Sequence, residues 1–338
     1  MGEIDERGVR EVVDDTAAAT GFSGVVRLDR GGVTEVDAAF GLADRRHGIP
    51  MTTATRLGTA SGTKALTAVT VMSLVTEGLL SLATPVRDVL GDDLPLVDDR
   101  VTVEHLLTHR SGIGDYVDEE VFTDVTDHVL AEPVHTLTTA EDYLTVLDGR
   151  PQAFAPGAQC VYNNGAFVVL AIVAGRVAGR TYEQLVTERV LEPAGMARSG
   201  FLRSDELPAD AAIGYLWDDR PRTNLLHLPV VGSGDGGLYT TTGDVAAFWR
   251  ALDSGTLLPS EVLADMMVAR GTEPSGQRYG LGLGLGLQDG VVSLVGSDAG
   301  VSFRSVLDRN RDLAWTVISN TSEGAWPLSR ALIAHLAD

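Results

Sequence analysis

Residues 59–78 read TASGTKALTAVTVMSLVTEG, and the rest of the chain is best interpreted around this segment. From Ala65 to Glu77 almost every side chain is apolar, which predicts a helix that is buried on all sides. Gly78 follows it as a helix stop. Ser61 and Lys64 precede the apolar run three residues apart. This spacing puts the serine in the first helical turn and the lysine one turn further on the same face.

Lys64 is the only lysine of the chain, and the other 25 of its 26 basic residues are arginines. Of these two side chains, only lysine can give up its proton inside a protein, because the guanidinium of arginine stays charged. Burial disfavours the ammonium form, and a neutral amine can then take the proton of a neighbouring hydroxyl. We therefore predict that Ser61 is a nucleophile and Lys64 its base. The competing interpretation is that Ser61 merely caps the helix, but an apolar helix that buries a lone lysine without purpose would be costly.

A second polar cluster, Tyr162-Asn163-Asn164, stands directly before another apolar run at residues 165–177. A tyrosine at such a loop-to-helix boundary can point its hydroxyl into a cleft. The alternative is a packing aromatic followed by a helix-capping asparagine.

Strands are predicted near both ends of the chain, and helices fill the middle. The strands are expected at 24–28, 33–40, 53–58, 279–287, 291–295, 301–307 and 313–318. The helices are expected at 3–19, 65–77, 103–109, 140–148, 165–177, 182–191, 242–252 with Thr242 as its cap, 260–268 and 326–336. This order predicts an α+β fold: an antiparallel sheet built from both termini, flanked by helices, with an inserted mainly helical lobe. We expect one catalytic domain, 1–338, with a sheet lobe of residues 1–60 plus 277–338 and a helical lobe of residues 61–276. Residues 203–232 are long for a structureless loop, which suggests that they border a site.

Composition narrows the function classes. The net charge of −21 disfavours nucleic acid and membrane partners. No run of about 18 apolar residues occurs, and the acidic start lacks the features of a secretion signal, so we expect a cytoplasmic protein. The single cysteine, Cys160, excludes an internal disulfide. His105 and His109 are four residues apart but lack the carboxylate of a zinc-protease motif, so we predict no metal and no cofactor. The sequence leaves the oligomeric state open.

Several segments together resemble the serine β-lactamase and penicillin-binding-protein family, most closely its class C and esterase branches. Ser61-x-x-Lys64 matches the signature of that family. The other similar segments follow in the same order along residues 22–320: Phe22-Ser23-Gly24-Val25-Val26, residues 105–113, Pro156-Gly157 through Tyr162-x-Asn164, residues 191–196, and residues 236–241 followed by Asp244. The resemblance implies the β-lactamase and transpeptidase fold. We expect the segment around His105 to be structural, because a shared fold segment does not by itself carry function.

The resemblance also implies roles for individual residues. Ser61 would form an acyl-enzyme, and Lys64 and Tyr162 would share the general-base and general-acid work. Asn164 would bind the acyl side of the substrate and Lys64. The backbone N–H groups of Ser61 and Gly300 would form the oxyanion hole.

The third motif of the family departs from its pattern. Residues 296–300 read GSDAG, so Ser297 stands where the family has a lysine or histidine, and Asp298 follows it. Ser297 and Asp298 would still contact the substrate, but the missing cation argues against a β-lactam. Arg304 could compensate. The sequence therefore predicts a serine hydrolase of a small ester or amide. A true β-lactamase, a D-amino peptidase and, from another class, a non-catalytic binding protein on this fold are the alternatives.

Overall fold

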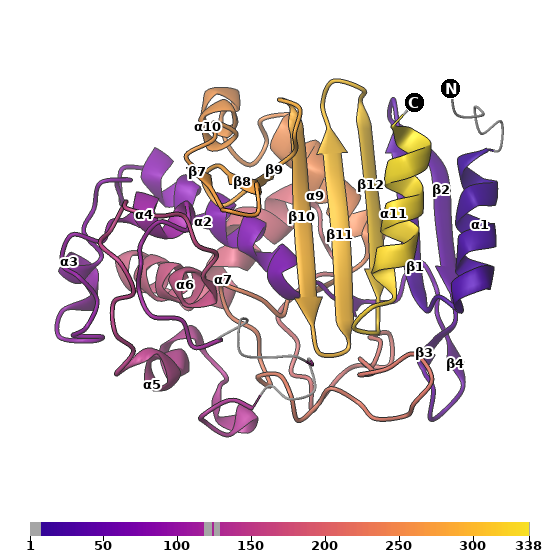
Figure 1. The fold of residues 1–338 in the computed structure, drawn as a ribbon, viewed down its shortest axis with the longest axis horizontal. Coiled ribbons are helices and arrows are strands. Elements are labelled where there is room, and N and C mark those ends of the chain that lie inside the picture. Colours follow the sequence, from indigo (N-terminus) through magenta and orange to yellow (C-terminus); the bar gives the residue numbers. More distant parts are fainter. Residues whose placement is uncertain (1–7, 118–123, 125–128, 338) are drawn as a thin grey trace.

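A single antiparallel sheet organises the molecule (Figure 1). The structure is a computed structural model that describes residues 8–117, 124 and 129–337. Within these residues the sheet has eight strands in the order β2-β1-β12-β11-β10-β9-β8-β7. The N-terminal strand β1 therefore lies beside the last strand, β12, with Val26 opposite Val317. The predicted α+β fold, with a sheet built from both ends of the chain, is confirmed.

The long strands carry the apolar residues that the sequence assigned to them. They are β1 Gly24–Arg30, β2 Val33–Phe40, β10 Val291–Asp298, β11 Val301–Asp308 and β12 Leu313–Ser319. The remaining edge consists of the two-residue strands β7 Gly271–Thr272, β8 Arg278–Tyr279 and β9 Gly284–Leu285. The predicted strand at 279–287 is thus divided, and the sheet already begins at Gly271.

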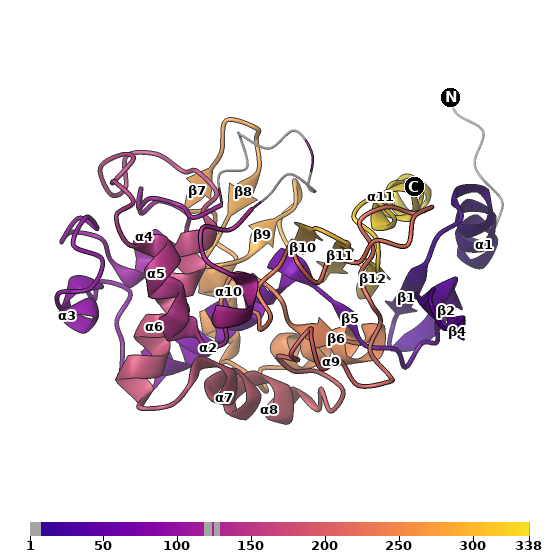
Figure 2. The same cartoon turned by 90° about the horizontal axis from the view of Figure 1, so that it is seen from below.

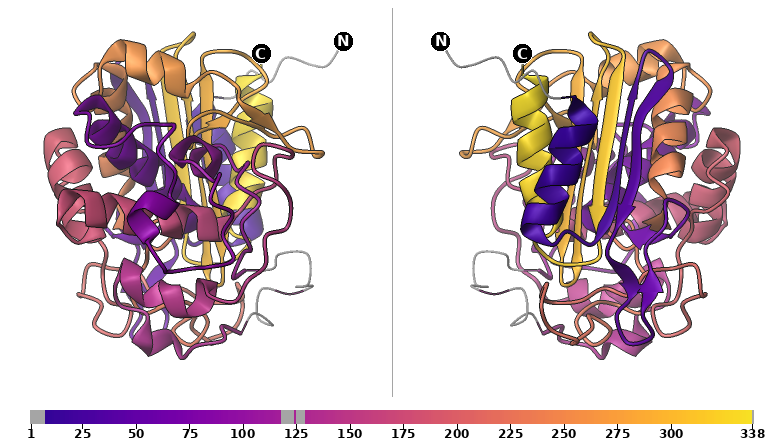
Figure 3. Two further views of the ribbon diagram at one scale, coloured as in Figure 1. Left: turned by 90° about the vertical axis from the view of Figure 1, so that its left-hand side faces the viewer. Right: turned by 90° about the vertical axis from the view of Figure 1, so that its right-hand side faces the viewer.

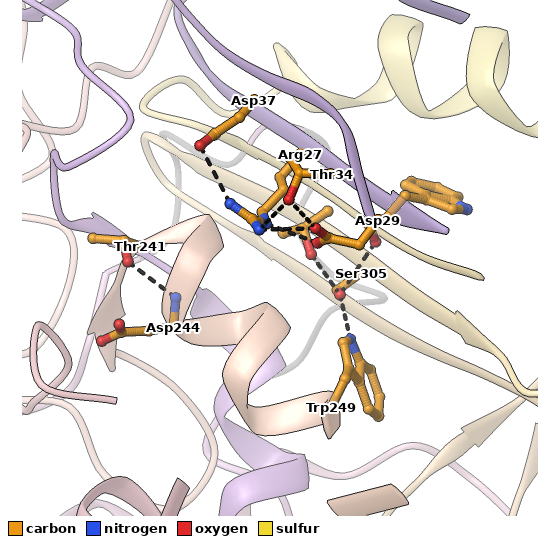
Figure 4. A network of polar contacts seen from close by, with 10 residues as sticks. Arg27, Asp29, Thr34, Asp37, Thr241, Asp244, Trp249 and Ser305 are labelled. Atoms are coloured by element: carbon orange, nitrogen blue, oxygen red, sulfur yellow. Dashed lines mark hydrogen bonds and ion pairs between the residues drawn. The ribbon is translucent and has the colours of Figure 1, made fainter. Parts of the chain in front are cut away.

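Helices cover both faces of the sheet. Helices α1 Val9–Thr20 and α11 Ala325–Leu336 lie side by side on one face, and α9 Thr242–Asp253 lies on the other (Figures 2 and 3). The indole Nε1 of buried Trp249, on α9, donates a 2.7 Å hydrogen bond to Ser305 Oγ on β11 (Figure 4). This contact fixes α9 against the strand that neighbours β10.

Two buried helices form the centre of the helical part. They are α2 Lys64–Thr76 and α6 Asn164–Ala178, which pack against each other. Around them lie α3 Arg87–Leu90, α4 Val103–Leu107, η3 Val134–Thr136, η4 Ala140–Tyr143, α5 Leu144–Leu147, α7 Tyr182–Val186, the π-helical turn η5 Thr187–Leu191, α8 Glu192–Ala194 and α10 Ser260–Met266. The helix expected at 182–191 therefore runs on to Ala194, past a π-helical turn.

Three local predictions need correction. The strand expected at 53–58 is reduced to β5 Leu57–Gly58, which pairs with β6 Tyr239–Thr240 outside the main sheet. The cap of α9 is Thr241, whose side chain accepts from Asp244 N, and not Thr242 (Figure 4). The expected helix at 3–19 begins at Val9, and residues 3–7 lie outside the described part.

In the described part, no single helix is both long and apolar enough to cross a membrane. Only α6 and the helical run Tyr182–Ala194 would pass such a test together, and they are bent by 83° relative to each other.

Candidate active site

Ser61 lies on a tight turn between β5 and α2. Residues Ala60–Thr63 form a 3₁₀ turn, η1, and Ala60 has a φ of 45°. This turn packs directly on β10, because an ideal Cβ on Gly296 would lie 2.1 Å from the Thr59 carbonyl oxygen and 3.0 Å from Ser61 N. A Cβ on Gly62 would lie 2.4 Å from the Phe303 ring. Only glycine therefore permits so close an approach of the turn and the strand, and half-buried Ser61 faces the strand edge.

Lys64 connects Ser61 to two other segments. Its Nζ donates to Ser61 Oγ at 2.9 Å, to Asn164 Oδ1 at 2.8 Å and to the Asp235 carbonyl oxygen at 2.8 Å. The lysine is only 5% exposed. Ser61, Lys64 and Asn164 therefore lie together, as the sequence predicted. Asn164 and Asp235 are 100 and 171 residues away from Lys64 in the sequence.

The start of α6 gives its two asparagines separate tasks. Asn163 is the N-cap, and its Oδ1 accepts from Ala166 N at 2.6 Å. Asn164 is thereby left to turn its side chain to Lys64. From the sequence, a helix-capping asparagine was the alternative to a site residue. In the structure Asn163 is the cap and Asn164 contacts Lys64.

Tyr162 lies beside both Lys64 and His109. The Lys64 Nζ is 4.8 Å from the centroid of the Tyr162 ring, and the His109 ring lies 4.7 Å from it at an interplanar angle of 31°. His109 Nδ1 accepts from Asn163 N at 3.1 Å. Burial, with a smaller contribution from the charge of Lys64, lowers the pKa of His109 to about 3, so the ring is neutral at physiological pH. His109 therefore packs against Tyr162 as a neutral ring.

Three residues around Lys64 were not predicted from the sequence: Asp115, Tyr116 and Asp235. Asp115 accepts from Asn164 N at 2.6 Å and from Gly165 N at 3.0 Å, which satisfies amides at the start of α6. The Tyr116 hydroxyl donates to Asp235 Oδ2 at 2.5 Å. Asp115 and Tyr116 directly follow the family-like segment 105–113, and that adjacency is the only signal the sequence held for them.

Ser61 opens into a cavity of about 690 Å³. Its wall includes Ser61, Tyr162 and Asn164 together with Ser297 and Asp298 from β10. The apolar and aromatic residues of the wall include Tyr116, Val117, Leu130, Tyr143, Leu202, Leu228, Pro229 and Val230. The loop at 203–232 thus borders the cavity, as its length had suggested. A cavity of this size accommodates a small organic ligand.

The structure does not support Gly300 as an oxyanion donor. Its N–H donates to Ser322 Oγ at 2.9 Å, in the hairpin turn that follows β10. A different amide of β10 faces the cavity edge. The carbonyl of Ser293 is directed at its partner Gly284 on β9, so by alternation the backbone of Ser297 points to the same edge. Among the described residues, β10 pairs with β9 only at Val292 and Ser293, which leaves the rest of that edge of β10 open beside Ser61.

Arg304 brings a cation to the same cavity from β11, opposite Val295. Its Nε is buried without a hydrogen-bond partner, and burial lowers the pKa of the guanidinium. No ion pair of Arg304 occurs within the described residues. The charges at this wall are therefore mixed: Arg304 is cationic, whereas Asp298 and Glu273 are acidic.

No three histidine, cysteine, aspartate or glutamate side chains gather as a metal site in the described part of the chain. His105 and His109 serve different partners, because the Nδ1 of His105 accepts from Thr102 N at 3.2 Å in the capping box of α4. Burial raises the pKa of the Cys160 thiol to about 11, so this cysteine is not a reactive thiolate near neutral pH.

Comparison with known proteins gives one family. PbpX of Bacillus subtilis, which carries the name of a penicillin-binding protein, is 28% identical over 264 residues, or 78% of this chain and 62% of PbpX. The esterase EstB of Burkholderia gladioli is 29% identical over 287 residues, or 72% of this chain and 70% of EstB. The crystal structure of a penicillin-binding protein from Bacillus halodurans superposes with a TM-score of 0.88 at 34% identity, over 97% of this chain and 99% of that one. These relatives support a hydrolase of this superfamily. The model of the beta-lactamase family matches residues 9–337, and the chain therefore belongs to the beta-lactamase family.

Proposed function

We propose that the chain is a serine hydrolase that cleaves a small ester or amide through an acyl-enzyme on Ser61. The observation that carries the proposal is the 2.9 Å contact between Lys64 Nζ and Ser61 Oγ at the edge of the cavity. The similarity to EstB, an esterase, supports the same reaction class.

The reaction would proceed in two displacements. Ser61 Oγ bonds to the substrate carbonyl carbon, and its proton passes to the Lys64–Tyr162 pair. The pair returns that proton to the departing oxygen or nitrogen as the carbonyl bond to the leaving group breaks. Water then attacks the acyl carbon, gives one proton to the same pair, and Ser61 leaves as the hydroxyl again.

The developing oxyanion needs donors that already point at it. We propose the N–H of Ser61 and, in place of Gly300, the N–H of Ser297. Both lie next to Gly296, and the backbone of Ser297 faces the open strand edge. The loss of one such donor typically costs about 10²–10³ in rate.

An ester or amide is preferred over a β-lactam because the third motif has no cation at Ser297. The observation that keeps a true β-lactamase as a second candidate is Arg304, whose guanidinium lines the same cavity. Arg304 lies on β11, next to the strand that carries Ser297, and from there it could bind an anionic group of the substrate.

An activated nitrophenyl ester tests the proposal. We expect a burst of nitrophenol equal to the enzyme concentration, an intact mass increased by one acyl group, and at least about a 10³-fold loss of the rate in Ser61→Ala. Ser73→Ala, which removes a serine from the far end of α2, is the matched control and should retain the rate. Equal rates for wild type and Ser61→Ala would exclude a Ser61 acyl-enzyme.

The alternative of another class, a binding protein without catalysis, gives the opposite result. A fluorophosphonate probe would then fail to label Ser61, while a small ester or amide in the cavity would still raise the melting temperature.

A further inference from the structure

The surroundings of Lys64 suit an ammonium ion. Its Nζ donates to three acceptors at 2.8–2.9 Å, the Ser61 hydroxyl, the Asn164 side-chain oxygen and the Asp235 carbonyl oxygen. An ammonium has three protons to donate, whereas a neutral amine has two. The lysine is 5% exposed, and a buried cation of this kind needs a nearby negative charge.

Asp235 is in the right place to supply that charge. Its main-chain carbonyl is in contact with Lys64, its side chain is buried, and its carboxylate interacts electrostatically with Lys64. Burial raises the pKa of Asp235, whereas the charge of Lys64 and the hydrogen bond from Tyr116 act in the opposite direction. The segment that carries Asp235 is itself anchored to α2, because Thr67 Oγ1 donates to the Gly234 carbonyl at 2.6 Å.

Tyr116 holds the carboxylate in one orientation. Burial and the neighbouring Asp235 raise the pKa of the phenol well above its ordinary value, so Tyr116 stays a donor at all working pH values. The preceding residue, Asp115, holds the backbone of Asn164. The dipeptide 115–116 therefore positions two of the three partners of Lys64.

We propose that Asp235 is the buried counter-charge of Lys64, that Tyr116 positions it, and that the charge of Asp235 sets the pH above which Ser61 can be activated. The last clause rests on the proposed function. With Asp235 ionised, Lys64 rests as an ammonium, and it can accept the Ser61 proton only after it has lost one of its own. Asp235 and Tyr116 are positioning residues in this scheme, because they act through Lys64.

Other charged and titratable groups that face this region come from each neighbouring element. They are His109, Asp115 and Tyr116 from the segment after α4, Tyr143 from η4, Tyr162 before α6, Tyr182 from α7, and Asp298 from β10. His109 is neutral, and the oxygens of Asp115 are turned to the amides of Asn164 and Gly165. Asp298 lies toward Gly236, with its Oδ2 3.8 Å from the position of a Cβ there.

The unique lysine allows a direct test. Because Lys64 is the only lysine, protein labelled with ¹³C-lysine gives one ε-carbon signal, and its pH titration by NMR reports the charge of Lys64 alone. Asp235→Asn keeps an acceptor for Tyr116 but removes the charge. We expect the titration midpoint of Lys64 to fall by about one pH unit or more, because an opposite charge at close range stabilises the ammonium.

Two comparisons separate charge from packing. Tyr116→Phe removes the hydrogen bond but keeps the carboxylate, so the Lys64 midpoint should not fall. Asp308→Asn removes a buried carboxylate at the far end of β11 and should leave the midpoint unchanged. If Asp235→Asn does not fold, Asp235→Ser provides a second neutral variant. An unchanged midpoint in the neutral variants, or an equal fall in Tyr116→Phe, would overturn the proposal.

Reactivity is measured separately with a fluorophosphonate probe across the same pH range. The rising limb of the labelling rate at Ser61 should move to lower pH in Asp235→Asn together with the NMR midpoint. A limb that stays in place while the midpoint moves would overturn the link to Ser61. A wild-type protein that never labels at Ser61 would instead overturn the proposed function, and the counter-charge would still be decided by the NMR titration.

Discussion

The Arg304 side chain places a cation at the wall of the cavity. Its Nε is buried and lacks a partner, and its neighbours on the wall include Val295, across the strand pair, and Ser297. A buried N–H without an acceptor is unfavourable, so an anionic group on a ligand would gain a charge-assisted hydrogen bond there. Asp298 lines the same cavity and carries a negative charge.

We expect Arg304→Gln to discriminate between charged and neutral esters. Hydrolysis of 4-carboxyphenyl acetate should lose about tenfold or more in kcat/KM, mainly through KM, because a charge-assisted hydrogen bond contributes roughly 1.5–3 kcal/mol. Hydrolysis of phenyl acetate should change little. The control Arg189→Gln, whose partner is Glu77 on the helical side, should affect neither ester. Equal losses on both esters would show that Arg304 supports the fold of the wall and not the ligand.

Single residues also show where the sequence was informative. Ser61 and Lys64 could be paired because they are three residues apart on one helix start, and burial of the lone lysine marked the site. Tyr116 and Asp235 could not be paired, because 119 residues separate them and only the folded loops bring them together. Gly300 was assigned to the oxyanion hole through the resemblance. In the structure its N–H donates to Ser322 Oγ instead, in the hairpin turn after β10.

At the scale of elements, the buried helices and long strands followed directly from the sequence. The run at 165–177 forms most of α6, Asn164–Ala178, because a helix that is apolar on nearly every side is stabilised when it is buried in a core. The short strands β5 and β7 to β9 were not delimited, because two-residue strands depend on pairing with a distant partner more than on their own residues.

The cap of α9 offers a paired test of helix stability. Thr241 accepts from Asp244 N at 3.1 Å, whereas the buried Oγ1 of Thr242 has no hydrogen-bond partner. We expect Thr241→Ala to lower the free energy of unfolding by about 1 kcal/mol and Thr242→Ala to lower it less, as the first removes a cap and the second an unsatisfied hydroxyl. Urea unfolding followed by circular dichroism measures both. A larger loss in Thr242→Ala would return the cap to that residue.

At the scale of the whole molecule, the sheet brings the two ends of the chain together, with β1 beside β12. Helices α1 and α11 pack together over β1 and β12, and Val13, Val26, Trp315 and Leu328 belong to one apolar cluster there. The main core lies on the opposite side, around α2 and α6. The site lies where β10 meets the η1 turn, next to the main core.

The net charge of −21 makes a prediction for the entire molecule. Self-repulsion among 47 acidic and 26 basic residues destabilises the compact state, and salt screens it over about 10 Å at 0.1 M. We expect the melting temperature to rise between 0.02 and roughly 0.5 M NaCl, and to rise equally in NaBr of the same ionic strength. Differential scanning fluorimetry measures this. A gain limited to sulfate salts would indicate exclusion of the salt from the surface instead of screening.

The burial of Lys64 limits how the protein can be modified chemically. Reagents that acylate ε-amines, such as succinimidyl esters and amine crosslinkers, have a single lysine to find, and it is 5% exposed behind Ser61. Immobilisation through lysine would therefore modify Lys64 and disrupt its contact with Ser61. Coupling through the side chains of the 47 aspartates and glutamates is a route that leaves the Lys64 amine untouched.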